Sequence, residues 1–171
     1  MIINNNNSPL QQELHPQHKS NLMYLHSKAV NRLHLFLYHN VDVKIGYKKL
    51  INKTKNFYLK EQFATYADQH QIFCNQLRRE IEALNTEIIP EAKIYITAHQ
   101  YWIDLKTLIS SQHDQAYLEY AVALEDALLL EYKNLADDHT IPMSTRKLVS
   151  EQYESIDSIF DTIDLRQAFQ N

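Results

Sequence analysis

The stretch Tyr117–Leu135, YLEYAVALEDALLLEYKNL, decides the fold class, because its apolar residues recur at the three-and-four spacing of a core-facing helix. The members of this apolar stripe are Leu118, Ala121, Leu128, Tyr132 and Leu135. One acid, Glu125, falls in the gap between Ala121 and Leu128 on the same stripe. A carboxylate that faces the core of a bundle needs hydrogen-bonding partners or a bound ligand. The stretch therefore predicts a buried helix and singles out Glu125 as its candidate functional residue.

The rest of the chain predicts an all-α protein. Only one glycine and four prolines occur in 171 residues, which removes the turn chemistry that sheets and hairpins need. Apolar residues at helical spacing outline five helices. We expect the first helix to begin between Ser20 and Ser27 and to end at about Thr54, and the second to run from the N-cap Asn56 to about Leu84. The third covers about 92–109, and the fourth covers about 114–136 after an N-cap at Ser110 or Ser111. The last begins after the N-cap Ser144 and frays near Phe169. Short loops then give two antiparallel pairs in a four-helix bundle, with the shorter helix 92–109 in the long connection between them.

Two of the expected helices carry stripes that bear on the core. In the second helix His70 completes an apolar stripe made of Phe63, Tyr66, Phe73, Leu77, Ile81 and Leu84. The last helix is expected to bury Leu148, Tyr153, Ile156, Phe160 and Ile163. Cys74, the only cysteine, lies beside the stripe of the second helix and is predicted to be a small buried hydrophobe. A single cysteine also excludes an intramolecular disulfide and a cysteine zinc site.

Length and composition predict one domain that follows a disordered arm. Residues 1–19 contain an asparagine run and two prolines without hydrophobic periodicity, which is typical of a disordered segment. Residues 20–171 are long enough for a single helical-bundle domain with a real core.

Charge and hydropathy exclude several classes of partner. The formal net charge of -4 and the pI near 6.1 argue against binding to nucleic acid or to an anionic membrane. The basic residues Lys44, Lys48 and Lys49 are interpreted as a solvated face. No segment reaches about 18 consecutive apolar residues, and no basic start is followed by an apolar run, so neither a membrane span nor a secretory signal is predicted. A cytoplasmic protein is the resulting prediction.

Four pieces of the chain resemble a known family. They are LFLYHNVDVKIGYKKL (35–50), HQYWIDLKTLI (99–109), YLEYAVALEDALLLEY (117–132) and VSEQYESI (149–156). Over about residues 33–165 the chain resembles the bacterial ferritin-like four-helix bundles of the domain of unknown function 2383 type. The resemblance implies a ferritin-like fold and brings no activity with it. A role in stress follows only by analogy with other ferritin-like proteins, and fold does not fix function.

The chain departs from this family at two places that concern candidate ligands. The family's last helix often carries a His-Asp pair, which would fall at Phe160 and Asp161, so the histidine is absent here. An acid-rich run in the family is thinned to residues 121–123, AVA. Both departures remove candidate metal ligands.

A metal site is therefore the second hypothesis. A ferritin-like di-iron site takes one Glu from each of two helices and a Glu-x-x-His pair from each of the other two. This sequence has no such pair, because Ala67 stands three residues before His70 and the last helix has no histidine. The candidate ligands that remain are Asp42, His70, Glu119 and Glu125. We expect no cofactor, with iron or another divalent metal as the alternative.

The competing interpretation of Glu125 is structural. Its carboxylate is then expected to accept hydrogen bonds from His70, from a tyrosine hydroxyl or from a lysine across the bundle. The leading functional prediction is a noncatalytic bundle that acts through helix surfaces or forms a homo-oligomer, with enzyme activity left open. The alternative is a di-iron oxidase or metal store with a degenerate carboxylate and histidine site.

Overall fold

A computed structural model describes residues 16–84 and 114–162 of the chain. These residues form four helices and no strand: α1 (Pro16–Lys53), α2 (Phe57–Ala83), α4 (Asp114–Ala136) and α5 (Met143–Thr162). The predicted all-α bundle is confirmed for this part of the chain. No helix in the described ranges is long and apolar enough to cross a membrane.

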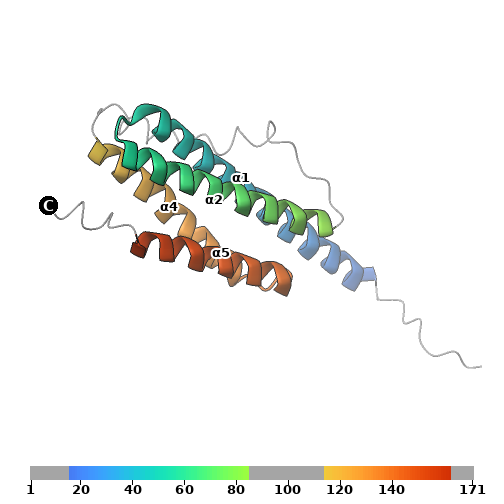
Figure 1. Cartoon of the computed structure of the whole chain (residues 1–171). Coiled ribbons are helices and arrows are strands. Elements are labelled where there is room, and N and C mark those ends of the chain that lie inside the picture. The colour runs from blue at the N-terminus through green and yellow to red at the C-terminus, as the bar shows by residue number, and fades with distance from the viewer. Residues whose placement is uncertain (1–15, 85–113, 163–171) are drawn as a thin grey trace, which may run out of the picture.

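The four helices form two hairpins that pack against each other (Figure 1). Helix α1 packs mainly against α2 and α4, and α5 packs mainly against α4 and α2, around a shared core. The core is made of apolar and aromatic side chains from all four helices; its most deeply buried members include Leu33, Tyr47, Leu77, Tyr120, Tyr132 and Val149. Burial of these side chains, at roughly 1.5–3 kcal/mol for each large apolar one, drives the association of the hairpins.

Polar residues fix one end of the bundle. Asn56 caps α2, and its side chain accepts a hydrogen bond from the backbone N–H of Leu59 at 3.3 Å, as the sequence predicted. The Thr54 hydroxyl donates to Oδ1 of Asp114 at 2.9 Å, and Nδ2 of Asn56 donates to Oδ2 of the same carboxylate at 3.2 Å. Because Asp114 is the first residue of α4, these bonds hold the start of the second hairpin against the loop of the first.

Helix α1 begins earlier than the sequence predicted. We expected a start between Ser20 and Ser27, within a chain disordered through residue 19, whereas the helix begins at Pro16. Every residue from Lys19 to Lys28 is exposed, so these turns bury no stripe that apolar periodicity could have revealed. The helix continues there beyond its packed part, because adding residues to a formed helix costs far less than nucleating one. The rest of the predicted arm, residues 1–15, lies outside the described residues.

The predicted start of α5 was wrong by two residues, and its predicted buried face was right only in part. Helix α5 begins at Met143, and the carbonyl of Pro142 already accepts the backbone N–H of Arg146 at 3.0 Å, so Ser144 lies inside the first turn. Among the side chains of α5 that the structure describes, the buried ones are Thr145, Val149, Gln152 and Ile156. Ile156 is therefore buried as predicted, whereas the expected Leu148 and Tyr153 are half-buried.

Polar contacts with α2 explain this shift. The hydroxyl of Thr145 donates to Oε2 of Glu80 at 2.6 Å, and Nε2 of Gln152 donates to Oε1 of Gln76 at 2.8 Å. Two of the four inward positions of α5 are therefore polar, and a hydropathy pattern assigns such positions to the outside.

The remaining predictions concern Cys74, three lysines and parts of the chain that lie outside the described residues. Cys74 is fully buried, as predicted. Lys48 and Lys49 are exposed, but Lys44 is half-buried and donates to Oε1 of Gln71 at 3.0 Å. The helix expected over 92–109, the caps at positions 110 and 111, the side chain at position 160 and residues 163–171 lie outside the described residues.

Candidate functional site

Glu125 is buried, as the sequence predicted, with 4% of its surface exposed. It projects from α4, where it shares the buried face with Leu118, Ala121, Leu124, Leu128 and Tyr132. Its Oε1 accepts a hydrogen bond of 2.6 Å from the hydroxyl of Tyr47 on α1. The same oxygen lies 2.9 Å from Nε2 of His70 on α2. The structural interpretation, with a histidine and a tyrosine as partners, is thus confirmed, and no lysine takes part in these contacts.

Asn40 extends these contacts into a chain of five side chains. Its Oδ1 lies 3.0 Å from Nδ1 of His70 and accepts a 2.9 Å hydrogen bond from the hydroxyl of Tyr132. His70 and Asn40 are 1% and 0% exposed. Asn40, Tyr47, His70, Glu125 and Tyr132 are hereafter called the buried network; they join α1, α2 and α4.

The hydrogen-bond pattern assigns the protons of His70. Nδ2 of Asn40 donates to the carbonyl of Phe36 at 3.0 Å, so the amide oxygen must face His70. Nδ1 of His70 therefore donates a proton to Asn40. At the other nitrogen, a 2.9 Å approach to Oε1 of Glu125 requires one proton between the two atoms. His70 and Glu125 thus hold that proton together, as imidazolium and carboxylate or as imidazole and carboxylic acid, and the pair is neutral overall either way.

The tyrosines of the network are kept protonated. Burial raises the pKa of Tyr47 well above its ordinary value of 10.0, and the charge of Glu125 and the hydrogen bond to it raise the pKa further. Burial, and next the charge of Glu125, also raise the pKa of Tyr132. Burial is again the first cause for Tyr66, whose pKa is raised by the same carboxylate. Tyr47 and Tyr132 therefore act as hydrogen-bond donors in the core.

One oxygen of the network is left over. Oε2 of Glu125 is buried and has no hydrogen-bond partner among the described residues. A buried acceptor without a partner costs about 1–3 kcal/mol. This oxygen is the one position in the network where a further donor or an ion would be favourable.

The four candidate ligands do not converge. His70 and Glu125 meet, whereas Glu119 is exposed on α4 and accepts from Nε2 of Gln115 at 3.4 Å. Asp42 is half-buried beside Tyr120, where burial and then the charge of Asp42 raise the tyrosine pKa. Within the described ranges, no three His, Cys, Asp or Glu side chains are placed to hold a metal ion. These residues do not fit a di-iron centre, which takes four carboxylates and two histidines.

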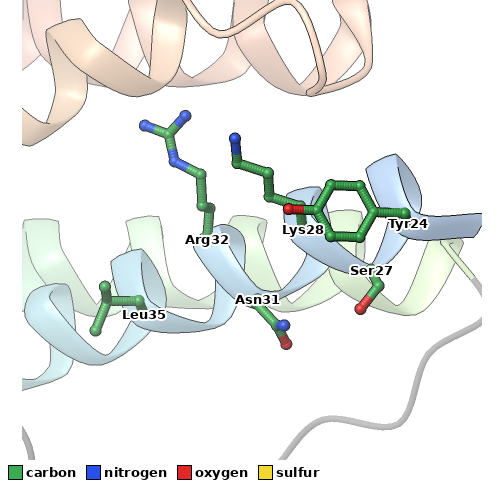
Figure 2. A pocket seen from close by; sticks show the side chains of 6 residues that line it. All are labelled: Tyr24, Ser27, Lys28, Asn31, Arg32 and Leu35. Atoms are coloured by element: carbon green, nitrogen blue, oxygen red, sulfur yellow. The ribbon is translucent and has the colours of Figure 1, made fainter. Parts of the chain in front are cut away.

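A second feature lies on the surface of α1. An open groove of about 330 Å³ is lined by Tyr24, Ser27, Lys28, Asn31, Arg32 and Leu35. Figure 2 shows Lys28 and Arg32 reaching toward the same side of the helix, with Tyr24 beside Lys28. Arg32 forms an ion pair with Asp138 in the loop between α4 and α5. The groove therefore lies where α1 leaves the bundle, and it combines apolar, aromatic and basic side chains.

Sequence reasoning missed Asn40 and the surface groove. Asn40 lies on the same stripe as Leu33, Phe36 and Leu37, so the argument applied to Glu125, a polar residue at an apolar position, would have found it. The groove left no such signal, because hydrophobic periodicity reports only the faces that pack.

Comparison with known proteins gives one match. The family model that matches residues 28–138 is described as a domain of unknown function (DUF2383). No curated protein and no solved structure matches the chain. The matched range starts within α1, at the edge of the groove, and ends in the loop after α4 at Asp138.

Proposed function

The chain belongs to the family described as a domain of unknown function (DUF2383), and we propose that it acts by self-association through helix surfaces and not by catalysis. The observation that carries the proposal is an apolar run at the start of α1. Leu22, Met23, Tyr24 and Leu25 are between 42% and 69% exposed. Residues 16–28 of α1, hereafter the projection, extend beyond the other helices (Figure 1).

The energetics of exposed apolar surface support this function. Consecutive residues of a helix point in different directions, so these four apolar side chains surround α1, and only Leu22 and Leu25 lie side by side. Exposed apolar side chains that are close together mark interaction sites more often than isolated ones do. Covering such side chains yields about 25 cal/mol for each Å² removed from water. The projection makes this surface available without any rearrangement of the core.

The state of the buried network also favours a noncatalytic role. Both ring nitrogens of His70 are engaged, and the side chain is almost completely buried. A general acid or base must come within hydrogen-bond reach of its substrate. The network's groups are instead bonded to one another, which is the arrangement expected of a group that specifies the packing of three helices.

Light scattering at several protein concentrations tests the proposal. The wild-type mass is expected to rise with concentration, and a Leu22→Ser/Met23→Ser variant is expected to stay monomeric over the same range. Ile72→Ser, which changes an exposed apolar residue on α2, is the matched control and should associate as the wild type does. A wild-type protein that is monomeric at every concentration would refute the function.

A second candidate function, binding of a single divalent ion such as iron, is favoured by one observation. Oε2 of Glu125 is buried without a hydrogen-bond partner among the described residues, and carboxylate oxygens are common metal ligands. Metal analysis of protein purified after iron supplementation tests this candidate against a Glu125→Ala variant. Bound metal that is lost in the variant would support it, and absence of metal from both samples would remove it.

A further inference from the structure

We propose that the projection of one chain docks on the outward face of α4 in a second copy, an inference that rests on the self-association proposed above. The acceptor surface is the stripe formed by Glu119, Ala123, Asp126 and Leu130, hereafter the acceptor stripe. All four residues are exposed, and their spacing of four, three and four places them on one side of α4.

Charge distribution along the two helices is the first support. From residue 16 to residue 41, α1 contains Lys19, Lys28 and Arg32 and no acid. Residues 114–138, which are α4 and the two residues after it, contain six acids besides the buried Glu125 and a single cation, Lys133. The chain as a whole is only weakly acidic, so this separation creates two surfaces of opposite sign on one molecule.

Contacts within one chain show how these two surfaces pair. Arg32 forms an ion pair with Asp138, and Nδ1 of His39 contacts the carboxylate of Glu131 on α4. The Asp138 contact places the loop after α4 level with Arg32, and α1 then runs past this loop (Figure 1). Lys28 precedes Arg32 by one helical turn, and no described acid forms an ion pair with Lys28 or with Lys19. The same pairing becomes available to the acids that a second copy exposes.

The shapes and the apolar groups of the two surfaces also match. The groove beside Lys28 and Tyr24 can receive side chains of another helix, and Leu35 provides an apolar wall at its far end. On the acceptor stripe, Leu130 is 63% exposed, and the small Ala123 permits close approach of a second helix. Glu119 and Asp126 flank these apolar positions with charges that complement the two lysines.

This contact joins two different surfaces and is not reciprocated between the same two chains, so it is heterologous. Each chain then carries one donor surface and one acceptor surface. Damage to either surface abolishes self-association, whereas two chains damaged at different surfaces still offer one intact pair.

Sedimentation of mixed full-length variants tests this assignment. The donor-defective variant is Leu22→Ser/Met23→Ser, and the acceptor-defective variant is Glu119→Lys/Asp126→Lys. We expect each variant alone to sediment as a monomer and an equimolar mixture to form a dimer. An Asp68→Lys variant, which reverses an exposed acid on α2, should associate like the wild type. Equal unfolding midpoints of all variants show that the folds are intact.

The outcomes separate this inference from the proposed function. If the wild type associates but the acceptor-defective variant associates equally well, the acceptor stripe is the wrong surface while self-association stands. If both variants are monomeric and their mixture also stays monomeric, the heterologous contact is refuted. A monomeric wild type refutes self-association itself.

Discussion

Helix α1 has a packed part that buries polar side chains and a projection that exposes apolar ones. Its packed part, Ala29–Lys53, buries polar groups such as His34 and Asn40, and it supplies Tyr47 to the buried network. Its projection exposes a run of apolar side chains, Leu22–Leu25. Polarity alone therefore does not decide burial along this helix. Neighbouring helices decide it, because they provide hydrogen-bond partners for buried polar groups, whereas the other described helices leave every residue from Lys19 to Lys28 exposed.

The two parts of α1 affect different properties: the packed part affects the stability of one chain, and the projection affects association between chains. The packed part holds three helices together through hydrogen bonds whose loss leaves buried groups without partners. The projection contributes little to the fold of a single chain and presents the surface proposed to bind a second copy. Changes in the packed part should therefore act on the free energy of unfolding, and changes in the projection on the association constant.

The largest effect is expected for Glu125→Ala. This change leaves the donors of Tyr47 and His70 in the core without their acceptor, and breaking one partner of a buried pair typically costs about 3–5 kcal/mol. Urea unfolding measures the loss. Glu119→Ala, on the exposed side of the same helix, is the control and should change stability by less than about 0.5 kcal/mol. Similar losses for the two variants would show that Glu125 is not held in the network.

A smaller effect is expected for Tyr47→Phe. The change removes one hydroxyl and keeps the ring that packs near Phe63 and Tyr66. Loss of a hydrogen bond to a carboxyl group costs about 1.5–3 kcal/mol when that group is charged. Urea unfolding again gives the value, and Tyr58→Phe, at an exposed position, should be neutral. No loss at position 47 would mean that the 2.6 Å contact contributes nothing to stability.

Stability should also fall at high pH. The pKa of Tyr47 is raised in the folded chain above 10.0, so between the two values only the unfolded chain releases the proton. The stabilisation is fully present below about pH 10 and is lost as pH rises above it, by about 1.4 kcal/mol per pH unit for each such tyrosine. Unfolding free energies between pH 8 and 11 measure this slope. Tyr47→Phe should have a shallower slope than the wild type; equal slopes would contradict the assignment.

The smallest effect on stability is expected for Leu22→Ser/Met23→Ser. These exposed side chains contact no core, so the free energy of unfolding at low protein concentration should change by less than about 0.5 kcal/mol. Dilute samples keep association from adding to the apparent stability. A large loss in urea unfolding would show that the projection is part of the folded core.

The sequence predicts most of the helices and two members of the buried network, His70 and Glu125. Hydrophobic periodicity identifies which side of each helix is covered, and that is enough to place Glu125 and His70 inside the bundle. The same argument places both ends of α4 and the cap at Asn56. It fails at α5, where Thr145 and Gln152 are buried through polar contacts with α2.

Two other features depend on how the helices are placed relative to one another. Periodicity does not give the register of one helix against another, so it could not select Tyr47 among eleven tyrosines as the partner of Glu125. It also could not show that Asp42 and Glu119 do not join His70 and Glu125 in a group of metal ligands. The projection is also missed by this method, because a helix segment that buries no side against the described helices has no preferred apolar side.

Amide hydrogen exchange along α1 tests whether its two parts have separate roles. The exchange is measured at low and at high protein concentration. We expect strong and equal protection in the packed part at both concentrations, because those amides open only with the bundle. In the projection we expect weak protection in dilute solution and stronger protection when chains associate. If residues 17–28 are protected equally at both concentrations, the two parts of α1 do not have separate roles.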